Sequence, residues 1–377
     1  MTGPVAPGVW EAGREPGHRQ FVELSRPGGA GFHLEGGGSL DSVTVAFETW
    51  GELNREHTNA ILVLHALTGD SHVAGVAGPG HPTPGWWDRV VGPGAAIDTD
   101  RFFVVCPNVL GGCQGTTGPG SPAGDGSPYG SRFPLITIRD QVAVEAMLSD
   151  RLGIDRWYAA IGGSMGGMRA LEWACGLPDR LERAVVLAVG AQASAEQIAL
   201  CSLQVRAIRA DPAFAGGDYY DAASWPLSGM ALARGLGQVS YRTPDELQNR
   251  FGRAAAGDED PWHGGRFAVE SYLEHHGDKL GRYFDPNSYI ILSEAMNHHD
   301  VGRGRGGIDV ALAKVTATVV VAGIASDRLY PLTQQFELAE LLPGDRPAAV
   351  LQSVSGHDGF LLETDQVSGV IATCLGG

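Results

Sequence analysis

Seven short apolar runs, rich in valine and isoleucine, constrain the fold of this chain more than any other feature. Each run is bounded by glycine, proline or aspartate, a pattern typical of strands buried on both faces of a sheet. Helical patterns separate several of the runs, so we expect a mostly parallel central α/β sheet flanked by helices. The predicted strands are residues 43–51, 60–67, 101–111, 156–163, 183–190, 316–323 and 348–356.

One of the helical segments carries its own start signal. In TIRDQVAVEAMLSDRLG, Thr137 and Asp140 stand at the spacing of a capping box, which satisfies two free backbone N–H groups at a helix start. The apolar residues that share one face of this predicted helix, and that we expect to face the core, are Val142, Ala143, Ala146 and Met147.

Residues 192 to about 300 interrupt the alternation of strands and helices. Their patterns are long, mixed and largely helical, as in SAEQIALCSLQVRAIRA. An insertion of this size between consecutive strands usually packs as a cap over a site. We therefore expect residues 1–191 and 308–377 to form one core, with residues 192–307 as a helical cap, or lid, inserted between strands.

Composition restricts the classes of partner. The formal net charge of −16 argues against nonspecific binding to nucleic acid or to an anionic membrane, because both need a positive surface. The start MTGPVAPGVWEAGREPG lacks the pattern of a secretory signal, and the apolar runs are too short to cross a bilayer. Five cysteines without CxxC spacing favour reduced thiols and a cytoplasmic location.

A serine surrounded by glycines is the strongest functional signal. Ser164 fits the pattern Gly162-x-Ser164-x-Gly166, with the strand-like WYAAI before it and the helix-like MRALEWACGLP after it. A strand–turn–helix setting of this kind holds a nucleophilic serine on a strained turn, where only small residues fit beside it. The sequence therefore predicts Ser164 as a catalytic nucleophile.

A serine nucleophile needs a base, and the base needs an orienting acid. In enzymes with this type of turn the acid follows the serine and the histidine comes last. His357 is the only histidine after residue 299, and Asp327 directly follows the predicted strand 316–323. The other aspartates considered for this role, which do not stand at a strand end in the required place, are Asp309, Asp345 and Asp358.

The negative charge that develops during acyl transfer needs two backbone N–H donors. The N–H of Met165 follows the nucleophile at a helix start and is the first predicted donor. The loop HALTGD after strand 60–67 is the natural source of the second, and we assign it to Leu67.

Other patterns are weaker. His298, His299 and Asp300 lack partners at metalloenzyme spacing, so we expect no metal. The glycine-rich turns contain neither a phosphate loop nor a dinucleotide fingerprint, and GRGRGG (302–307) is typical of a solvated connection.

The chain also resembles the homoserine O-acetyltransferases, acetyl-CoA-dependent enzymes of methionine biosynthesis in the α/β-hydrolase superfamily. The resemblance runs from about residue 43 to residue 362. The matching stretches include FETWGELN, NAILVLHALTGDSHV, GWWDRVVGPGAAIDTDRFFVVCPNVLGGCQGTTGP, YGSRFPLITIRDQV, GGSMGGMRALEWA, ARGLGQVSYRTPDELQNRFGR, SDRLYP and SGHDGFL.

This resemblance implies an α/β-hydrolase fold and a triad of Ser164, Asp327 and His357. It also implies that Arg234 and Asp358 hold the carboxylate and the ammonium of L-homoserine. The implied reaction is ping-pong acetyl transfer from acetyl-CoA through an acetyl-serine, with no permanently bound cofactor and no metal. The resemblance further implies a homodimer formed through the lid. One departure is visible after VGPG, where Ala95 and Ala96 replace the lysine that the family often has.

Three alternatives stay open at this point. The donor could be succinyl-CoA, the acceptor could be serine, or the triad could serve a plain serine esterase. The residues alone do not separate these reactions.

Overall fold

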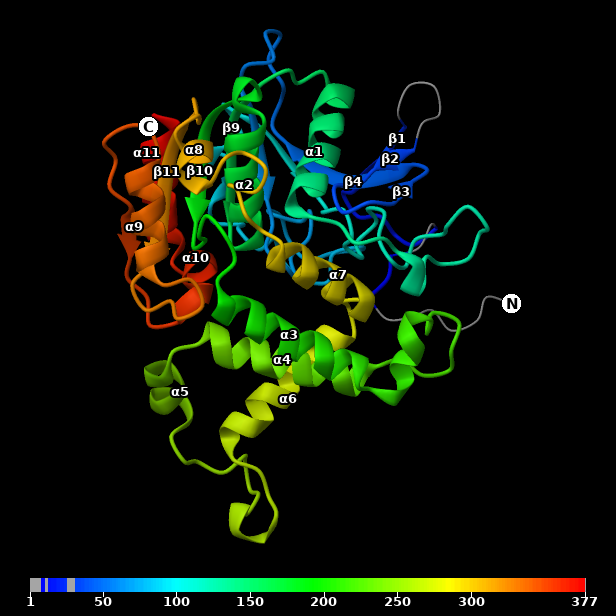
Figure 1. The fold of residues 1–377 in the computed structure, drawn as a ribbon. Coiled ribbons are helices and arrows are strands. Elements are labelled where there is room, and N and C mark those ends of the chain that lie inside the picture. The colour runs from blue at the N-terminus through cyan, green and yellow to red at the C-terminus, as the bar shows by residue number, and fades with distance from the viewer. Residues whose placement is uncertain (1–7, 11–12, 26–30, 377) are drawn as a thin grey trace.

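A computed structural model describes residues 8–10, 13–25 and 31–376 of the chain. An eight-stranded sheet forms its centre, in the order β1-β4-β8-β5-β9-β10-β11-β12 (Figure 1). The strand β4 pairs antiparallel with both of its neighbours, whereas every pair from β8 to β12 is parallel. The strands are β1 (Gln20–Leu24), β4 (Val43–Trp50), β5 (Ala60–Leu64), β8 (Phe103–Pro107), β9 (Trp157–Gly163), β10 (Leu181–Leu187), β11 (Thr318–Ile324) and β12 (Ala349–Leu351).

The predicted sheet is confirmed, with one strand missing from the prediction. Each of the seven predicted runs overlaps one strand of the sheet, although β10 begins two residues earlier and β11 ends one residue later than predicted, and several strands are shorter. Two two-stranded pairs lie outside the main sheet, β2 (Phe32–His33) with β3 (Ser39–Leu40) and β6 (Val91–Gly92) with β7 (Ile97–Asp98). The unpredicted strand β1 lies at the sheet edge, and of its residues only Leu24 is buried.

Helices cover both faces of the sheet, which explains the continuous apolar character of its strands. In β5, Leu62 and Leu64 pack in the core cluster that includes α1 (Ile138–Leu152), α2 (Met165–Gly176) and α9 (Leu332–Leu341). The alternating residues Ile61 and Val63 pack in a second cluster with α11 (Thr364–Leu375). The short helical segments of the core are Gly130–Arg132, Pro178–Arg180, Gly356–Asp358 and α10 (Gly359–Leu362).

Helix α1 begins at the predicted capping box, because Thr137 accepts a hydrogen bond from the Asp140 N–H and Asp140 accepts one from the Thr137 N–H. The predicted apolar face of α1 packs against the core, although only one of its four residues is fully covered. Val142 is buried, but Ala143, Ala146 and Met147 are half-buried. The fully covered positions instead include Glu145, whose carboxylate lies 2.7 Å from Arg169 of α2.

Between β10 and β11 the chain forms a layer of helices on one side of the core. Figure 1 shows α3, α4, α5 and α6 below the sheet, with α7 between them and the core. Their bounds, with the short segments among them, are α3 (Ala195–Arg209), Pro212–Gly217, α4 (Leu227–Tyr241), α5 (Pro244–Phe251), Pro261–His263, α6 (Ala268–Gly281) and α7 (Pro286–Asn297). The chain then returns to the core, where α8 (Ile308–Leu312) lies beside β10 and β11 (Figure 1).

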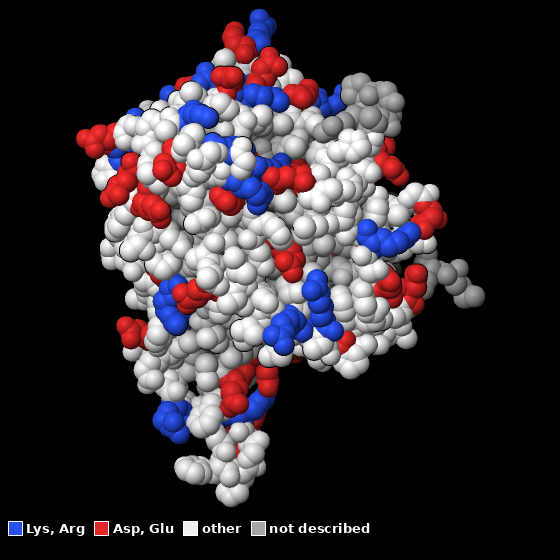
Figure 2. Space-filling view, viewed as in Figure 1, with Lys and Arg blue, Asp and Glu red and all other residues white. Residues whose placement is uncertain are grey.

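The surface carries charged side chains of both signs. On the face in Figure 2, basic side chains are interspersed with acidic ones. Within the described part of the chain, no helix combines the length and the apolar character needed to cross a bilayer. The N-terminal stretch read for a secretory signal lies partly outside the described residues.

The start of α2 packs against the end of β5 without room for a side chain. A Cβ atom on Gly166 would lie 2.0 Å from the carbonyl oxygen of Leu64 and 3.1 Å from that of His65. Both obstacles are backbone atoms, so relief requires the two elements to move apart. This glycine therefore fixes the separation between α2 and β5.

We predict that Gly166→Ala lowers the free energy of unfolding by about 1–3 kcal/mol, because overpacking displaces well-packed backbone. The matched control is Gly369→Ala in α11, where an added Cβ meets no atom within 4 Å. That change should raise stability by about 0.5–1 kcal/mol through helix propensity. Urea unfolding of both variants measures the difference, and equal midpoints would contradict the packing argument.

Candidate active site

Ser164 occupies the turn between β9 and α2 in a strained conformation. Its backbone has φ 55° and ψ −126°, a region that costs a non-glycine residue about 1–3 kcal/mol. The Ser164 N–H donates to the Leu187 carbonyl at 3.0 Å, which anchors the turn to β10. Gly162 allows the turn to close, because a Cβ there would lie 2.5 Å from the Gly166 backbone.

The structure brings Ser164, His357 and Asp327 into one hydrogen-bonded chain. The His357 Nε2 lies 2.9 Å from the Ser164 Oγ, and the His357 Nδ1 lies 2.7 Å from the Asp327 Oδ2. The three side chains come from the ends of β9, β11 and β12, which meet at one sheet edge because these strands are parallel. All three residues are buried. This chain can move a proton from the serine to the imidazole.

Backbone contacts hold the acid of this chain. The Asp327 Oδ1 accepts hydrogen bonds from the N–H groups of Leu329 at 2.8 Å and Tyr330 at 2.9 Å. Its Oδ2 is thereby directed at His357, and the Tyr330 ring stacks on the imidazole with centroids 5.0 Å apart. The carboxylate and the ring thus fix the orientation of His357.

The loop that carries His357 packs directly on the end of α4. Gly356 has φ +63°, and a Cβ there would lie 2.2 Å from the Tyr241 carbonyl oxygen at the end of α4. Thr243 also donates from Oγ1 to the Val354 carbonyl at 2.6 Å. The sequence analysis did not identify Tyr241 or Gly356, although a glycine directly before the histidine was a signal for a close approach.

Burial and neighbouring charges have opposite effects on the pKa of the His357 imidazole. Burial lowers the pKa of His357, but the charge and hydrogen bond of Asp327 and the charge of Asp358 outweigh it, so that the pKa is raised above 6.5. Asp327 therefore favours the protonated imidazole, which is the form produced when His357 accepts the serine proton.

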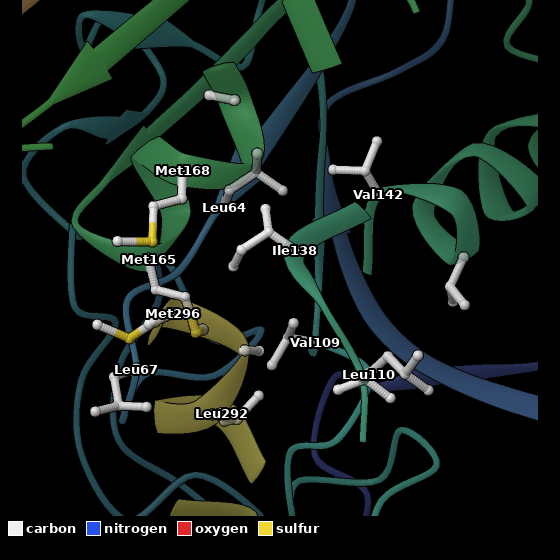
Figure 3. Packing of buried hydrophobic residues seen from close by; sticks show 14 of the residues in the cluster. Leu64, Leu67, Val109, Leu110, Ile138, Val142, Met165, Met168, Leu292 and Met296 are labelled. Carbon is white, nitrogen blue, oxygen red and sulfur yellow. The ribbon is translucent and has the colours of Figure 1, made fainter. Parts of the chain in front are cut away.

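Leu67 and Met165 lie together beside Ser164. Neither backbone N–H donates a hydrogen bond to any residue in the described part of the chain. Figure 3 shows both side chains in one apolar cluster with Leu292 and Met296 of α7. Two N–H donors without partners in a dry environment can stabilise an oxyanion.

A buried polar network supports the loop of Leu67 from behind. The His65 imidazole accepts the Val109 N–H at Nε2 (3.1 Å), and the Arg169 guanidinium donates to the His65 carbonyl. Burial and then the charge of Arg169 lower the pKa of His65 to about 3, so the ring is neutral. Glu145 pairs with Arg169 and also accepts from Trp173 at 2.8 Å. The network fixes the backbone immediately before Leu67.

Arg234 lies on α4, and its guanidinium contacts Gln238 of the same helix. With its amide oxygen turned toward this guanidinium, Gln238 accepts from Arg234 Nη2 at 2.9 Å and from Nε at 3.2 Å. The Tyr241 ring lies 5.8 Å from the Arg234 guanidinium carbon and 5.8 Å from the His357 ring centroid. Arg234 is thus connected through Tyr241 to the triad.

Asp358 follows His357 and is partly paired with the lid. Its Oδ2 lies 3.0 Å from Arg242 Nη2, and Arg242 also contacts Glu246 at 3.1 Å. The other oxygen of Asp358, Oδ1, accepts no hydrogen bond from a described residue. Arg242 was not identified from the sequence, because its partner lies more than a hundred residues away.

The residues weighed as a metal site have structural roles. His299 is buried and its Nε2 lies 3.0 Å from the Gly190 carbonyl oxygen, and burial lowers its pKa to about 4. Asp300 accepts the N–H groups of Gly302 and Arg303.

Among the described residues, the one set of three metal-type side chains with converging donor atoms is Glu48, His72 and His81. The two rings stack with centroids 3.9 Å apart, His72 Nδ1 lies 3.0 Å from Glu48, and His81 Nε2 accepts the His18 N–H. Hydrogen bonds within the protein thus occupy one nitrogen of each ring, whereas His72 Nε2 and His81 Nδ1 are buried and have no partner among the described residues.

Comparison with known proteins agrees with this geometry. A family model described as alpha/beta hydrolase fold matches residues 59–363. The chain is 57% identical over 371 residues to a homoserine O-acetyltransferase of Thermobifida fusca (strain YX), covering 98% of this chain and 97% of the relative. The chain belongs to the homoserine O-acetyltransferase family.

Solved structures of relatives superpose closely on this chain. The homoserine O-acetyltransferase from Bacillus anthracis superposes with a TM-score of 0.86 at 27% identity, covering 95% of this chain and 98% of that chain. Esterase E22 superposes with a TM-score of 0.84 at 29% identity, covering 95% of this chain and all (100%) of that chain. Homoserine O-acetyltransferases and an esterase therefore share this architecture.

We predict a pH dependence for Ser164 that Asp327 controls. Only neutral His357 can accept the serine proton, so the rate of Ser164 labelling by a fluorophosphonate should fall as the pH drops through a midpoint above 6.5. In Asp327→Asn, burial still lowers the pKa of His357, but the carboxylate that mainly raises this pKa is lost. The labelling should slow, and its midpoint should move below 6.5.

The control for this experiment is Asp365→Asn, because that carboxylate is 94% exposed in the first turn of α11 and does not contact His357. Its labelling profile should match that of the unmodified protein. A midpoint that stays above 6.5 in Asp327→Asn would mean that another charge sets the pKa of His357.

Proposed function

We propose that this protein transfers an acetyl group from acetyl-CoA to the hydroxyl of L-homoserine, giving O-acetyl-L-homoserine and CoA. The observation that carries this proposal is the buried chain from Ser164 through His357 to Asp327, in a member of the homoserine O-acetyltransferase family. The reaction needs no metal and no permanently bound cofactor, because all of its groups come from the chain.

In the first half-reaction, Ser164 Oγ attacks the thioester carbonyl while His357 Nε2 takes its proton. The N–H groups of Leu67 and Met165 hold the resulting oxyanion. The carbon–sulfur bond then breaks, and His357 returns the proton to the CoA sulfur. Acetyl-Ser164 and free CoA are the products, and Asp327 stabilises the imidazolium during the transfer.

In the second half-reaction, the homoserine hydroxyl loses its proton to His357 and attacks the acetyl carbon. The bond between that carbon and Ser164 Oγ breaks, and His357 returns the proton to the serine. The product is the acetyl ester of homoserine. This sequence of steps is ping-pong, because CoA leaves before the acceptor reacts.

We assign the acceptor contacts to Arg234 and Asp358. A guanidinium suits the homoserine carboxylate, and the Oδ1 of Asp358 suits its ammonium. Gln238 and Tyr241 support Arg234, whereas Arg242 holds the opposite oxygen of Asp358. The acceptor would thus lie between the lid and the histidine loop.

We further propose that residues 192–307 act as the lid of a core made from 1–191 and 308–377, and that two copies pair through this lid. Exposed apolar side chains on its helices favour such pairing, among them Leu203 (49% exposed) and Leu232 (59% exposed). Cys106, Cys113, Cys175, Cys201 and Cys374 are free thiols, which suits a cytoplasmic protein.

Ester hydrolysis is the second candidate, favoured by the close structural similarity to esterase E22. A triad serves either reaction, and the difference lies in whether water or homoserine reaches the acyl-serine. The succinyl donor and the serine acceptor are variants of the transferase reaction.

The products separate these reactions. The protein is incubated with acetyl-CoA or succinyl-CoA, with homoserine, serine or neither, and the products are identified by mass spectrometry. We predict O-acetylhomoserine with the first pair of substrates and little free acetate without an acceptor. Equal release of acetate with and without homoserine would show an esterase, and a succinyl or seryl product would reassign the substrate.

A further inference from the structure

Among the described residues, no carboxylate pairs with Arg234. This residue is half-buried on α4, and its guanidinium forms no ion pair in the described part of the chain. Its hydrogen-bond acceptor is instead the side-chain amide of Gln238, which is neutral and only 1% exposed. Partly burying a cation without a counter-ion is costly, so this arrangement indicates that the counter-ion comes with a ligand.

The charge of Arg234 acts on the neutral groups around it. Burial and then this charge lower the pKa of the half-buried His276 to about 4, so that the His276 ring is neutral near pH 7. Burial raises the pKa of the Tyr241 hydroxyl, and the charge of Arg234 opposes that rise. Neither group therefore carries a charge that could offset the charge of the guanidinium.

Gln238 occupies one edge of the Arg234 guanidinium. Its amide oxygen accepts from Nη2 at 2.9 Å and from Nε at 3.2 Å, so a single oxygen bridges the side of the group. A carboxylate can bind a guanidinium through two parallel hydrogen bonds, either at this side or across the two Nη atoms. Because Gln238 takes the side, the edge formed by Nη1 and Nη2 is left for a ligand.

The amide of Gln238 is held in this orientation from α6. Its nitrogen donates to the hydroxyl oxygen of Tyr272 at 2.8 Å. Tyr272 is buried, and its ring lies 4.9 Å from the Phe251 ring of α5. The two helices lie close together, because a Cβ on Gly277 of α6 would be 2.8 Å from the Cβ of Ala231 on α4. Helix packing thus determines which end of the amide faces Arg234.

We propose that Gln238 is a positioning residue that makes Arg234 selective for an acceptor with a carboxylate. The amide presents the Nη1–Nη2 edge of the guanidinium and, because it is neutral, leaves the charge unmatched until the acceptor carboxylate binds. This inference rests on the proposed function, since it explains how the acceptor of that reaction is recognised. A carboxylate in place of the amide would have the same shape but would pair with Arg234 permanently.

The test compares Gln238→Glu with Gln238→Ala. Both should raise the KM for homoserine on the order of tenfold, the first by pairing with Arg234 and the second by releasing it. The burst of acetyl-Ser164 from acetyl-CoA should stay unchanged in both, because Arg234 acts after CoA has left. The melting temperature should fall in Gln238→Ala but not in Gln238→Glu, whose new carboxylate has a cation beside it.

The matched control is Gln248→Glu, because Gln248 is exposed on α5 and forms no hydrogen bond with Arg234. It adds the same charge to the same group of helices and should leave the KM for homoserine unchanged. An unaltered KM in Gln238→Glu would overturn the proposal. Equal losses of the burst and of the acceptor step in both Gln238 variants would also overturn it, because Gln238 would then support the whole site.

The reactivity of Arg234 tests the arrangement without catalysis. Phenylglyoxal modifies arginine side chains, and peptide mass spectrometry follows the modification of Arg234. Compared with the unmodified protein, the reaction should be faster in Gln238→Ala and slower in Gln238→Glu. If no protein forms O-acetylhomoserine, the proposed function fails, and this labelling still decides whether Gln238 holds the guanidinium. Equal labelling in the three proteins would contradict the positioning role.

Discussion

The close approach of α2 to the end of β5 is the constraint on which the rest of the site depends. Gly166 lies so near the Leu64 carbonyl that no side chain fits between them. This contact fixes the position of the turn at Ser164 relative to β5. The backbone of Ser164 has φ 55° and ψ −126°. The same contact brings the Met165 N–H next to the loop of Leu67. One packing distance thus positions both the predicted nucleophile and the two backbone donors proposed for the oxyanion.

The helices between β10 and β11, which we propose to be a lid, contribute contacts to the candidate site. The Tyr241 carbonyl presses against Gly356, Thr243 bonds the Val354 carbonyl, and Arg242 pairs with Asp358. These contacts position the loop of His357 from the lid side. In the proposed reaction the acceptor would meet Arg234 from the lid and Asp358 from the core, so a change in the lid would alter acceptor binding and the base together.

Local patterns in the sequence were sufficient to predict the parts of the fold that depend on local physics. The parallel strands are continuous apolar runs, the capping box at Thr137 is a spacing rule, and the serine turn needs its glycines nearby. The strand β1 was missed because QFVEL at a sheet edge has little buried apolar surface. These residues form a strand because they pair with β4, and β4 lies too far along the chain for a local pattern to reveal that pairing.

The remaining errors concern contacts between distant residues. The burial of Glu145 on α1 was not predicted, because it depends on Arg169, and burial permits such an ion pair only when both partners are present. Arg242 and Asp358 meet in the same way. The triad could be predicted despite the long separations because the order of its members and the ends of parallel strands restrict the choice to few residues.

The central claim is that Ser164 carries the acetyl group between donor and acceptor. The most direct measurement mixes the protein briefly with acetyl-CoA alone, quenches with acid, and locates the label by peptide mass spectrometry. The account predicts one acetyl group on the peptide that contains Ser164, its loss when homoserine is added before the quench, and no label in Ser164→Ala. An acetyl group on another residue, or transfer that persists in Ser164→Ala, would contradict it.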